Sequence, residues 1–336
     1  MIRSLRVLLC IAMLASCALA QTNLNGAGAT FPYPIYSKWF NEYHNLHSDV
    51  QINYQSIGSG GGIRQVQAGT VDFGASDGPM TDEQIAQSKV KVLHVPTVLG
   101  SVVPAYNIPG VNAEIKFTPD ALAGIFLGKI SKWNDKAITS VNPGINFPDQ
   151  GITVVHRSDG SGTTYVWTDY LSKVSPEWQS AVGKGTSVKW PVGIGGKGNE
   201  GVSGSVRQLP GSIGYIELIY AVQNKIPYGI VKNSSGQFIK ADLASTTAAA
   251  AGVKMPPDFR VSITNSPAKT AYPISTFTWL LIPVNPADAN KGKILKDFLF
   301  WMLDKGQSMT EALSYAPLPK PVVDLEKAAI TKQVKP

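Results

Sequence analysis

One segment of the chain, residues 154–171, joins a strand-like run to a helix-like run through a turn of small residues. The apolar run ends at His156, Arg157 and Asp159 follow, and the turn reads Gly160-Ser161-Gly162-Thr163. The first N–H groups of a helix have no partner within the helix, and the helix dipole is positive there. Glycines let an anion approach these groups, while hydroxyls and Arg157 add donors. The segment predicts a site for a tetrahedral oxyanion, although the same turn could serve only as a helix cap.

The same organisation recurs earlier in the chain. Gly26, Gly28 and Thr30 precede a helical pattern, and an alternating strand runs into the glycine-rich stretch 58–62. The apolar face of the first helical pattern would carry Ile35, Trp39, Phe40 and Tyr43. A further strand-like run ends at Ser76-Asp77. This recurrence favours an anion site over a set of unrelated helix caps.

Strand-like and helix-like patterns alternate along the chain, which favours an α/β fold with a mixed, mainly parallel sheet. Helix starts are predicted at a Thr81/Gln84 capping box and at the Thr118-Pro119 and Ser175-Pro176 pairs. The longest predicted helix spans residues 291–303. Its buried side would carry Ile294, Leu295, Phe298, Leu299 and Met302.

Two long apolar runs, residues 95–108 and 272–283, are rich in β-branched residues and punctuated by proline. They could be two ordinary core strands. They could also connect two lobes, with residues 21–106 plus 277–336 forming one discontinuous lobe and residues 107–276 the other. In that arrangement the ligand would lie between the lobes.

The N-terminus has the pattern of a secretory signal over residues 1–20. Arg3 and Arg6 precede a short apolar core, and Ala18-Leu19-Ala20 forms a small-residue cleavage site. An alternative is a lipoprotein signal in which Cys17 is lipidated. Both cysteines, Cys10 and Cys17, lie within the signal, so cleavage after Ala20 would leave no disulfide or thiolate ligand.

Composition disfavours several classes of function. The formal net charge is +7, but the basic residues form no dense stripe with interleaved aromatics, as nucleic-acid binding requires. The four histidines, His44, His47, His94 and His156, lack the spacing of a zinc site. No metal and no cofactor is therefore predicted.

Five segments together resemble the phosphate-binding protein family of bacterial high-affinity phosphate ABC transporters. They are GAGATFPYPIYSKW, IGSGGGIRQVQAGTVDFGASD, HRSDGSGTTYVWTDYL, VKWPVGIGGKGNEGV and RQLPGSIGYIE. The resemblance covers nearly the whole chain after the signal. It implies a periplasmic-binding-protein fold with two α/β lobes, two crossover hinge strands and phosphate in the cleft. It also implies a periplasmic monomer that delivers phosphate to an ABC permease driven by an ATPase.

The resemblance further implies which residues bind phosphate. Asp159 would orient the side chain of Arg157 rather than touch the ligand. Gly60 and His156 depart from the family pattern, but both lie beside the implied contacts. The implied contacts are Thr30, Phe31 through its N–H, Ser59, Asp77, Arg157, Ser161, Gly162 and Thr163.

Asp77 is an unexpected residue in an anion site, because a carboxylate should repel the ligand. Phosphate carries at least one O–H at physiological pH, and an ionised carboxylate can accept that hydrogen. Sulfate has the same shape but no hydrogen at neutral pH. We therefore expect Asp77 to exclude sulfate, a discrimination worth about 10⁴–10⁵-fold in comparable sites.

Other functions remain as alternatives. An enzyme could use Ser161 as a nucleophile and His156 as a base, but the Gly-x-Ser-x-Gly elbow is absent there, and no enzymatic activity is expected. A binding protein for sulfate or molybdate would have no use for Asp77, because these oxyanions are fully deprotonated. A binding protein for an organic phosphate would need an open cleft, which the sequence leaves possible. An adhesive surface protein would need no convergent anion-binding loops.

Overall fold

The computed structural model describes residues 21–335. The predicted signal peptide, the alternative lipidation site at Cys17 and both cysteines lie outside these residues. Within the described part of the chain, none of the helices combines the length and apolar character needed to cross a bilayer.

Eight strands form one mixed sheet in the order β2-β1-β3-β11-β4-β8-β6-β7. Strand pairs are parallel at both ends of this order, while the β3-β11, β11-β4 and β4-β8 pairs are antiparallel. The expected mixed α/β class is confirmed. The strands of this sheet are β1 (Thr22–Gly28), β2 (Val50–Ser56), β3 (Phe73–Ser76), β4 (Val92–Asn107), β6 (Thr153–Arg157), β7 (Ile194–Gly196), β8 (Ser212–Glu217) and β11 (Ser275–Pro283).

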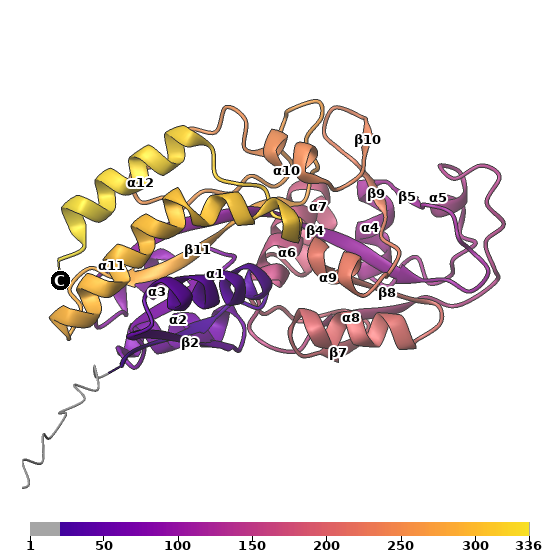
Figure 1. Ribbon diagram of the computed structural model, residues 1–336. Helices are drawn as coiled ribbons and strands as arrows, with labels where there is room; N and C mark the ends of the chain where they lie inside the picture. Colours follow the sequence, from indigo (N-terminus) through magenta and orange to yellow (C-terminus); the bar gives the residue numbers. More distant parts are fainter. Residues whose placement is uncertain (1–20, 336) are drawn as a thin grey trace, which may run out of the picture.

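Strand β4 links the two halves of the sheet. Its first part, up to Ser101, pairs with β11, and its last part, from Val102 onward, pairs with β8. Figure 1 shows β4 running from the end of the molecule that holds β1 and β2 toward the end that holds β8. Both long apolar runs are thus strands and are buried almost throughout. This arrangement agrees with either interpretation of the runs, and the lobe boundaries stay a prediction.

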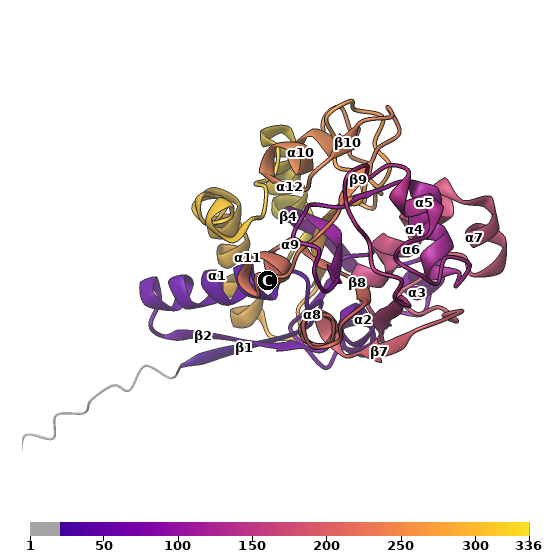
Figure 2. The same ribbon diagram turned by 90° about the vertical axis from the view of Figure 1, so that its right-hand side faces the viewer.

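Helices pack on both halves of the sheet. Helices α1 and α2 contact β2, β1 and β3, while α6 and α8 contact β8 and β6. Helix α10 and the small sheet β10-β9-β5 lie away from β1 and β2 in both views (Figures 1 and 2). The helices are α1 (Tyr33–Leu46), α2 (Ser59–Ala68), α3 (Asp82–Ala86), α4 (Pro119–Phe126), α5 (Lys136–Thr139), α6 (Gly162–Val174), α7 (Pro176–Ala181), α8 (Gly198–Gln208), α9 (Leu218–Gln223), α10 (Leu243–Ala249), α11 (Ala289–Asp304) and α12 (Lys320–Gln333). The remaining elements are β5 (Lys116–Phe117), β9 (Ile230–Lys232), β10 (Phe238–Ile239) and two 3₁₀ turns, η1 (Gly306–Met309) and η2 (Glu311–Leu313).

The predicted helix starts are confirmed by side-chain hydrogen bonds. Thr81 forms a capping box with Gln84, and Thr118 and Ser175 accept bonds from backbone N–H groups of the first helical turn. Helix α11 is longer than predicted at its N-terminus, where Asp288 caps it. On its core face Ile294 is only half-buried, whereas the other four predicted residues are buried.

A buried carboxylate fixes helix α6 to the segment that follows α10. Asp169 accepts hydrogen bonds from Ser262 (2.6 Å), Thr264 (2.5 Å) and Lys184 (2.8 Å). Burial alone would raise the pKa of Asp169, but these bonds and the charge of Lys173 outweigh it and lower the pKa to about 2. Because this pKa is depressed, the stabilisation is present above about pH 4 and is lost as the pH falls toward 2.

We predict that Asp169→Ala lowers the free energy of unfolding at pH 7 by at least about 2 kcal/mol, because two lysines and two hydroxyls lose a shared buried partner. Urea denaturation of the ligand-free protein measures this loss. The difference between variant and wild type should shrink between pH 4 and pH 2. Asp297→Ala, which removes an exposed carboxylate of α11, is the control and should cost little. A loss equal to that of the control would contradict the assigned role.

Candidate functional site

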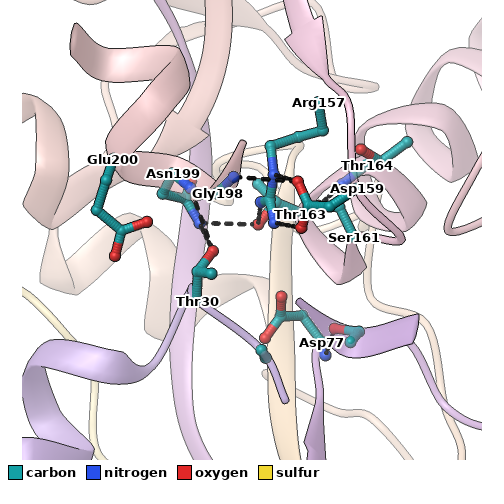
Figure 3. Close-up of polar contacts among 12 residues, drawn as sticks. Thr30, Asp77, Arg157, Asp159, Ser161, Thr163, Thr164, Gly198, Asn199 and Glu200 are labelled. Carbon is teal, nitrogen blue, oxygen red and sulfur yellow. Dashed lines mark hydrogen bonds and ion pairs between the residues drawn. The ribbon is translucent and has the colours of Figure 1, made fainter. Parts of the chain in front are cut away.

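The predicted site residues come from four places in the fold that lie far apart in the sequence. Thr30 and Phe31 follow β1, and Ser59 is the first residue of α2. Asp77 follows β3, and Arg157 ends β6 just before the start of α6. Thr30, Phe31, Ser59, Asp77, Arg157, Ser161, Gly162 and Thr163 are all buried. Figure 3 shows Thr30, Asp77, Arg157, Ser161 and Thr163 gathered in one region.

The two glycine-rich turns meet directly. The N–H of Gly60 donates to the carbonyl of Gly160 at 2.9 Å. Gly162 packs so closely that a Cβ on it would lie 2.6 Å from both the amide nitrogen and Oδ2 of Asp77. Such a distance leaves no room for a side chain, so Gly162 permits the start of α6 to approach the end of β3.

Arg157 is held in place by an acid and a phenol. Its Nε and Nη2 donate to the two carboxylate oxygens of Asp159 at 2.8 and 2.5 Å, and its backbone N–H donates to the Tyr215 hydroxyl at 3.0 Å. Burial would raise the pKa of Asp159, but the hydrogen bonds and charge of Arg157 and the N–H of Gly198 hold it below the ordinary value. The pair fixes the guanidinium group and leaves Nη1 to reach Thr163 at 3.3 Å.

Helices α6 and α2 both begin at this site. Ser161 caps α6 by accepting a bond from the Thr164 N–H at 3.0 Å. The Ser59 hydroxyl, at the start of α2, accepts a bond from the Asp77 N–H at 3.2 Å. Each helix end presents N–H groups and a positive dipole end to the same region. The helix-cap and anion-site interpretations of the Ser161 turn are therefore compatible.

One carboxylate oxygen of Asp77 is buried without a hydrogen-bond partner in the described part of the chain. Asp77 is 1% exposed, and its Oδ1 accepts a bond from the Thr278 hydroxyl at 2.9 Å. Among the residues the structure describes, its Oδ2 has no hydrogen-bond partner. Burial raises the pKa of Asp77 to about 7, although the Thr278 hydroxyl, the charge of Arg157 and the nearby Thr163 hydroxyl partly offset this rise. A buried acceptor without a donor is costly and is rare in protein interiors.

Sequence reasoning missed two polar partners of these residues. Thr278 lies on β11, where the register with β4 shifts between Thr278 and Trp279. Bulges of this kind re-aim side chains near functional sites. Asn199, at the start of α8, contacts both Thr30 and Thr163. Its segment, VKWPVGIGGKGNEGV, carries part of the family resemblance, but no local pattern distinguishes the asparagine.

Two tyrosines hold the loop that carries Thr30 and Phe31. The Tyr220 hydroxyl donates to the carbonyl of Thr30, and the Tyr315 hydroxyl donates to the carbonyl of Phe31, both at 2.6 Å. The ring of Phe31 also packs against Tyr315. These contacts fix the backbone between β1 and α1 and leave the Thr30 side chain to meet Asn199.

His156 is oriented by a contact with an aromatic ring. Its imidazole stacks on Trp190, with ring centroids 4.9 Å apart, and its Nδ1 lies 3.1 Å from the carbonyl of Arg157. Successive side chains of a strand point to opposite faces, so His156 and Arg157 diverge. Within residues 21–335, no group of three or more His, Cys, Asp or Glu side chains is arranged to hold a metal ion.

A PBP superfamily domain profile matches residues 15–305 of the chain. The phosphate-binding protein PstS of Xylella fastidiosa is 47% identical over 306 residues, which cover 90% of this chain and 83% of the relative. The PstS protein of Pasteurella multocida is 46% identical over 319 residues, covering 94% and 92%. These relatives are binding proteins by name, which confirms the expectation that the chain is not an enzyme.

Solved structures support the same fold. A high-affinity periplasmic phosphate-binding protein (PfluDING), with phosphate bound at pH 8.5, aligns with a TM-score of 0.73 at 20% identity, covering 94% of this chain and 99% of the other. A substrate-binding protein of a phosphate ABC transporter from Clostridium perfringens, described as putative and also with bound phosphate, aligns with a TM-score of 0.65 at 17% identity, covering 89% and 100%. From the profile match and the identity to the curated relatives, this chain belongs to the PstS family of phosphate-binding proteins within the PBP superfamily.

Proposed function

We propose that this protein binds inorganic phosphate and delivers it to an ABC permease for uptake. The family assignment supports phosphate as the ligand. The single observation that carries the proposal is the buried Oδ2 of Asp77, which lacks a donor among the described residues. That oxygen lies against the first residue of α6, where helix N–H groups and Arg157 favour an anion.

The proposed ligand set divides into donors and one acceptor. Phosphate oxygens would accept bonds from hydroxyl and N–H groups of both glycine-rich turns and from Arg157. Because Asp159 offsets the charge of Arg157, neutral dipoles supply most of the stabilisation. Asp159 orients the guanidinium group. The donors are Thr30, the Phe31 N–H, Ser59, Arg157, Ser161, Gly162 and Thr163, and the acceptor is Asp77.

Asp77 and the ligand would share one proton. Monobasic phosphate with ionised Asp77 and dibasic phosphate with protonated Asp77 contain the same atoms and charge, so the proton belongs to the pair. Fully deprotonated sulfate brings no hydrogen, so above the pKa of Asp77 it would face an ionised carboxylate in a buried site. The same argument disfavours molybdate.

The wider role follows the family. Loaded protein would dock on permease subunits and, through them, act with the ATPase. Residues 1–20 would direct export to the periplasm, either by cleavage after Ala20 or by lipidation of Cys17. Residues 21–106 plus 277–336 and residues 107–276 would form two lobes that close on the ligand, in a monomer. The passage of β4 from one half of the sheet to the other is compatible with this division.

We predict that Asp77→Asn reduces the preference for phosphate over sulfate by at least about tenfold, because the amide can donate to sulfate and no longer requires a ligand hydrogen. Competition calorimetry with both anions at pH 8 measures the ratio. Asp297→Asn removes the same charge from an exposed position on α11 and should leave the ratio unchanged. An unaltered ratio in Asp77→Asn would refute the acceptor role.

We predict that Arg157→Ala weakens phosphate binding by at least about 2 kcal/mol, the scale expected when a buried charge-assisted hydrogen bond is lost. The change also leaves Asp159 unpaired beside the anion. Calorimetric titration gives the affinity, and Arg207→Ala, at an exposed position of α8, is the control. If the affinity fell no more than in the control, Arg157 would not contact the ligand.

We predict a pH-dependent stability difference between Asp77→Asn and the wild type without ligand. Since burial raises the pKa of Asp77 to about 7, the wild type loses stability as the pH rises from about 4 through 7. The variant lacks this loss. The free energy of unfolding of the variant minus that of the wild type should therefore be about 2–4 kcal/mol larger at pH 8 than at pH 4. Urea denaturation in phosphate-free buffer tests this, and a pH-independent difference would contradict it.

A further inference from the structure

Asn199 bridges the two sides of the site. It is fully buried at the first turn of α8. Its Nδ2 donates to Oγ1 of Thr30 at 2.8 Å and to Oγ1 of Thr163 at 3.1 Å, and its backbone N–H donates to Thr30 at 3.2 Å. Figure 3 shows the amide between these two threonines. One threonine follows β1 and the other lies in the first turn of α6.

The orientation of the Asn199 amide follows from its third partner. Its Oδ1 accepts a bond from the backbone N–H of Glu217 at 2.9 Å. A backbone N–H can only donate, so the amide oxygen must face Glu217. The NH₂ group then faces the threonines and can only donate to them.

This orientation decides the direction of the threonine hydroxyl bonds. Oγ1 of Thr30 accepts two N–H bonds, both from Asn199. Oγ1 of Thr163 accepts one from Asn199 and one from Nη1 of Arg157 at 3.3 Å. A hydroxyl oxygen has two lone pairs and one hydrogen. With both lone pairs engaged, each hydroxyl can only donate its hydrogen to a further acceptor.

We infer that Asn199 is a positioning residue that makes the Thr30 and Thr163 hydroxyls obligatory donors to the bound anion. This inference rests on the proposed function and adds a residue that the ligand set does not contain. Asn199 acts through the two threonines and does not distinguish phosphate from sulfate, since both anions offer acceptor oxygens. Discrimination stays with Asp77, so affinity and selectivity are separable.

The test compares phosphate and sulfate binding of Asn199→Ala and Asn199→Asp with the wild type by calorimetry at pH 8. Asn199→Ala removes one of the two donors from each hydroxyl and should raise the phosphate Kd at least about tenfold, with a phosphate-to-sulfate ratio within about threefold of the wild type. Asn199→Asp keeps the bond to Glu217, but its carboxylate accepts from the threonines and turns their hydrogens away. It should weaken binding more than Asn199→Ala.

A thermodynamic cycle separates positioning from general structural damage. In a Thr30→Val/Thr163→Val background, Asn199→Ala should add less than about threefold to the Kd, because the groups it acts through are absent. Asn199→Asp should also raise the Kd by a smaller factor in that background than in the wild type. Some increase should remain, because the added negative charge still acts on the anion. Asn142→Ala is the matched control, since Asn142 is also buried and makes three hydrogen bonds away from the site. It should lower stability and leave the Kd unchanged.

If the wild type binds phosphate tightly and Asn199→Ala leaves the Kd unchanged, the inference alone is overturned. The same holds if the changes in Kd caused by Asn199→Ala and by the two threonine substitutions multiply fully. A changed phosphate-to-sulfate ratio in Asn199→Ala would also overturn it. If Asn199→Ala does not fold, Asn199→Asp decides, and wild-type affinity in that variant overturns the inference. Absence of phosphate binding by the wild type would overturn the proposed function and this inference with it.

Discussion

The organisation of the site depends on one buried carboxylate oxygen to which no described residue donates a hydrogen bond. Oδ2 of Asp77 lies against Gly162, and the cost of burying it raises the pKa of Asp77 to about 7. Protein interiors usually satisfy such atoms. Local exceptions concentrate at functional sites, where stability is given up for the chemistry of the ligand. A tetrahedral anion that carries a hydrogen would satisfy this oxygen and the surrounding donors together.

The remaining groups are arranged so that the charge of Arg157 is offset and the directions of the hydrogen bonds are fixed. Asp159 binds two donors of Arg157, Ser161 and Ser59 mark helix starts, and Asn199 orients two hydroxyls. The sheet order accounts for their convergence. The parallel strands β1 and β3 deliver Thr30 and Asp77 from one half, and β6 delivers Arg157 from the other. Strand β4 joins these halves, so bending of β4 would change the distance between Asp77 and Arg157.

Much of this arrangement could be predicted because its signals are local. The glycine-rich turns, the caps at Thr81, Thr118 and Ser175, and the long apolar strands each depend on residues close in sequence. The convergence of the proposed ligand residues could be predicted only from the family resemblance. The contacts of Asn199 with Thr30 and of Thr278 with Asp77 could not be predicted from local sequence, because the two residues of each contact lie 169 and 201 residues apart. The antiparallel centre of the sheet and the register shift in β11 likewise arise from tertiary pairing.

The central claim is that Asp77 accepts a hydrogen from the bound ligand. The most direct measurement is the carboxyl ¹³C resonance of Asp77 followed by NMR from pH 5 to pH 9, with and without phosphate. The account predicts that Asp77 titrates near pH 7 in the free protein and that phosphate abolishes this titration across the range, because the pair then holds one shared proton. A resonance that titrates near pH 4 and does not respond to phosphate would contradict the account.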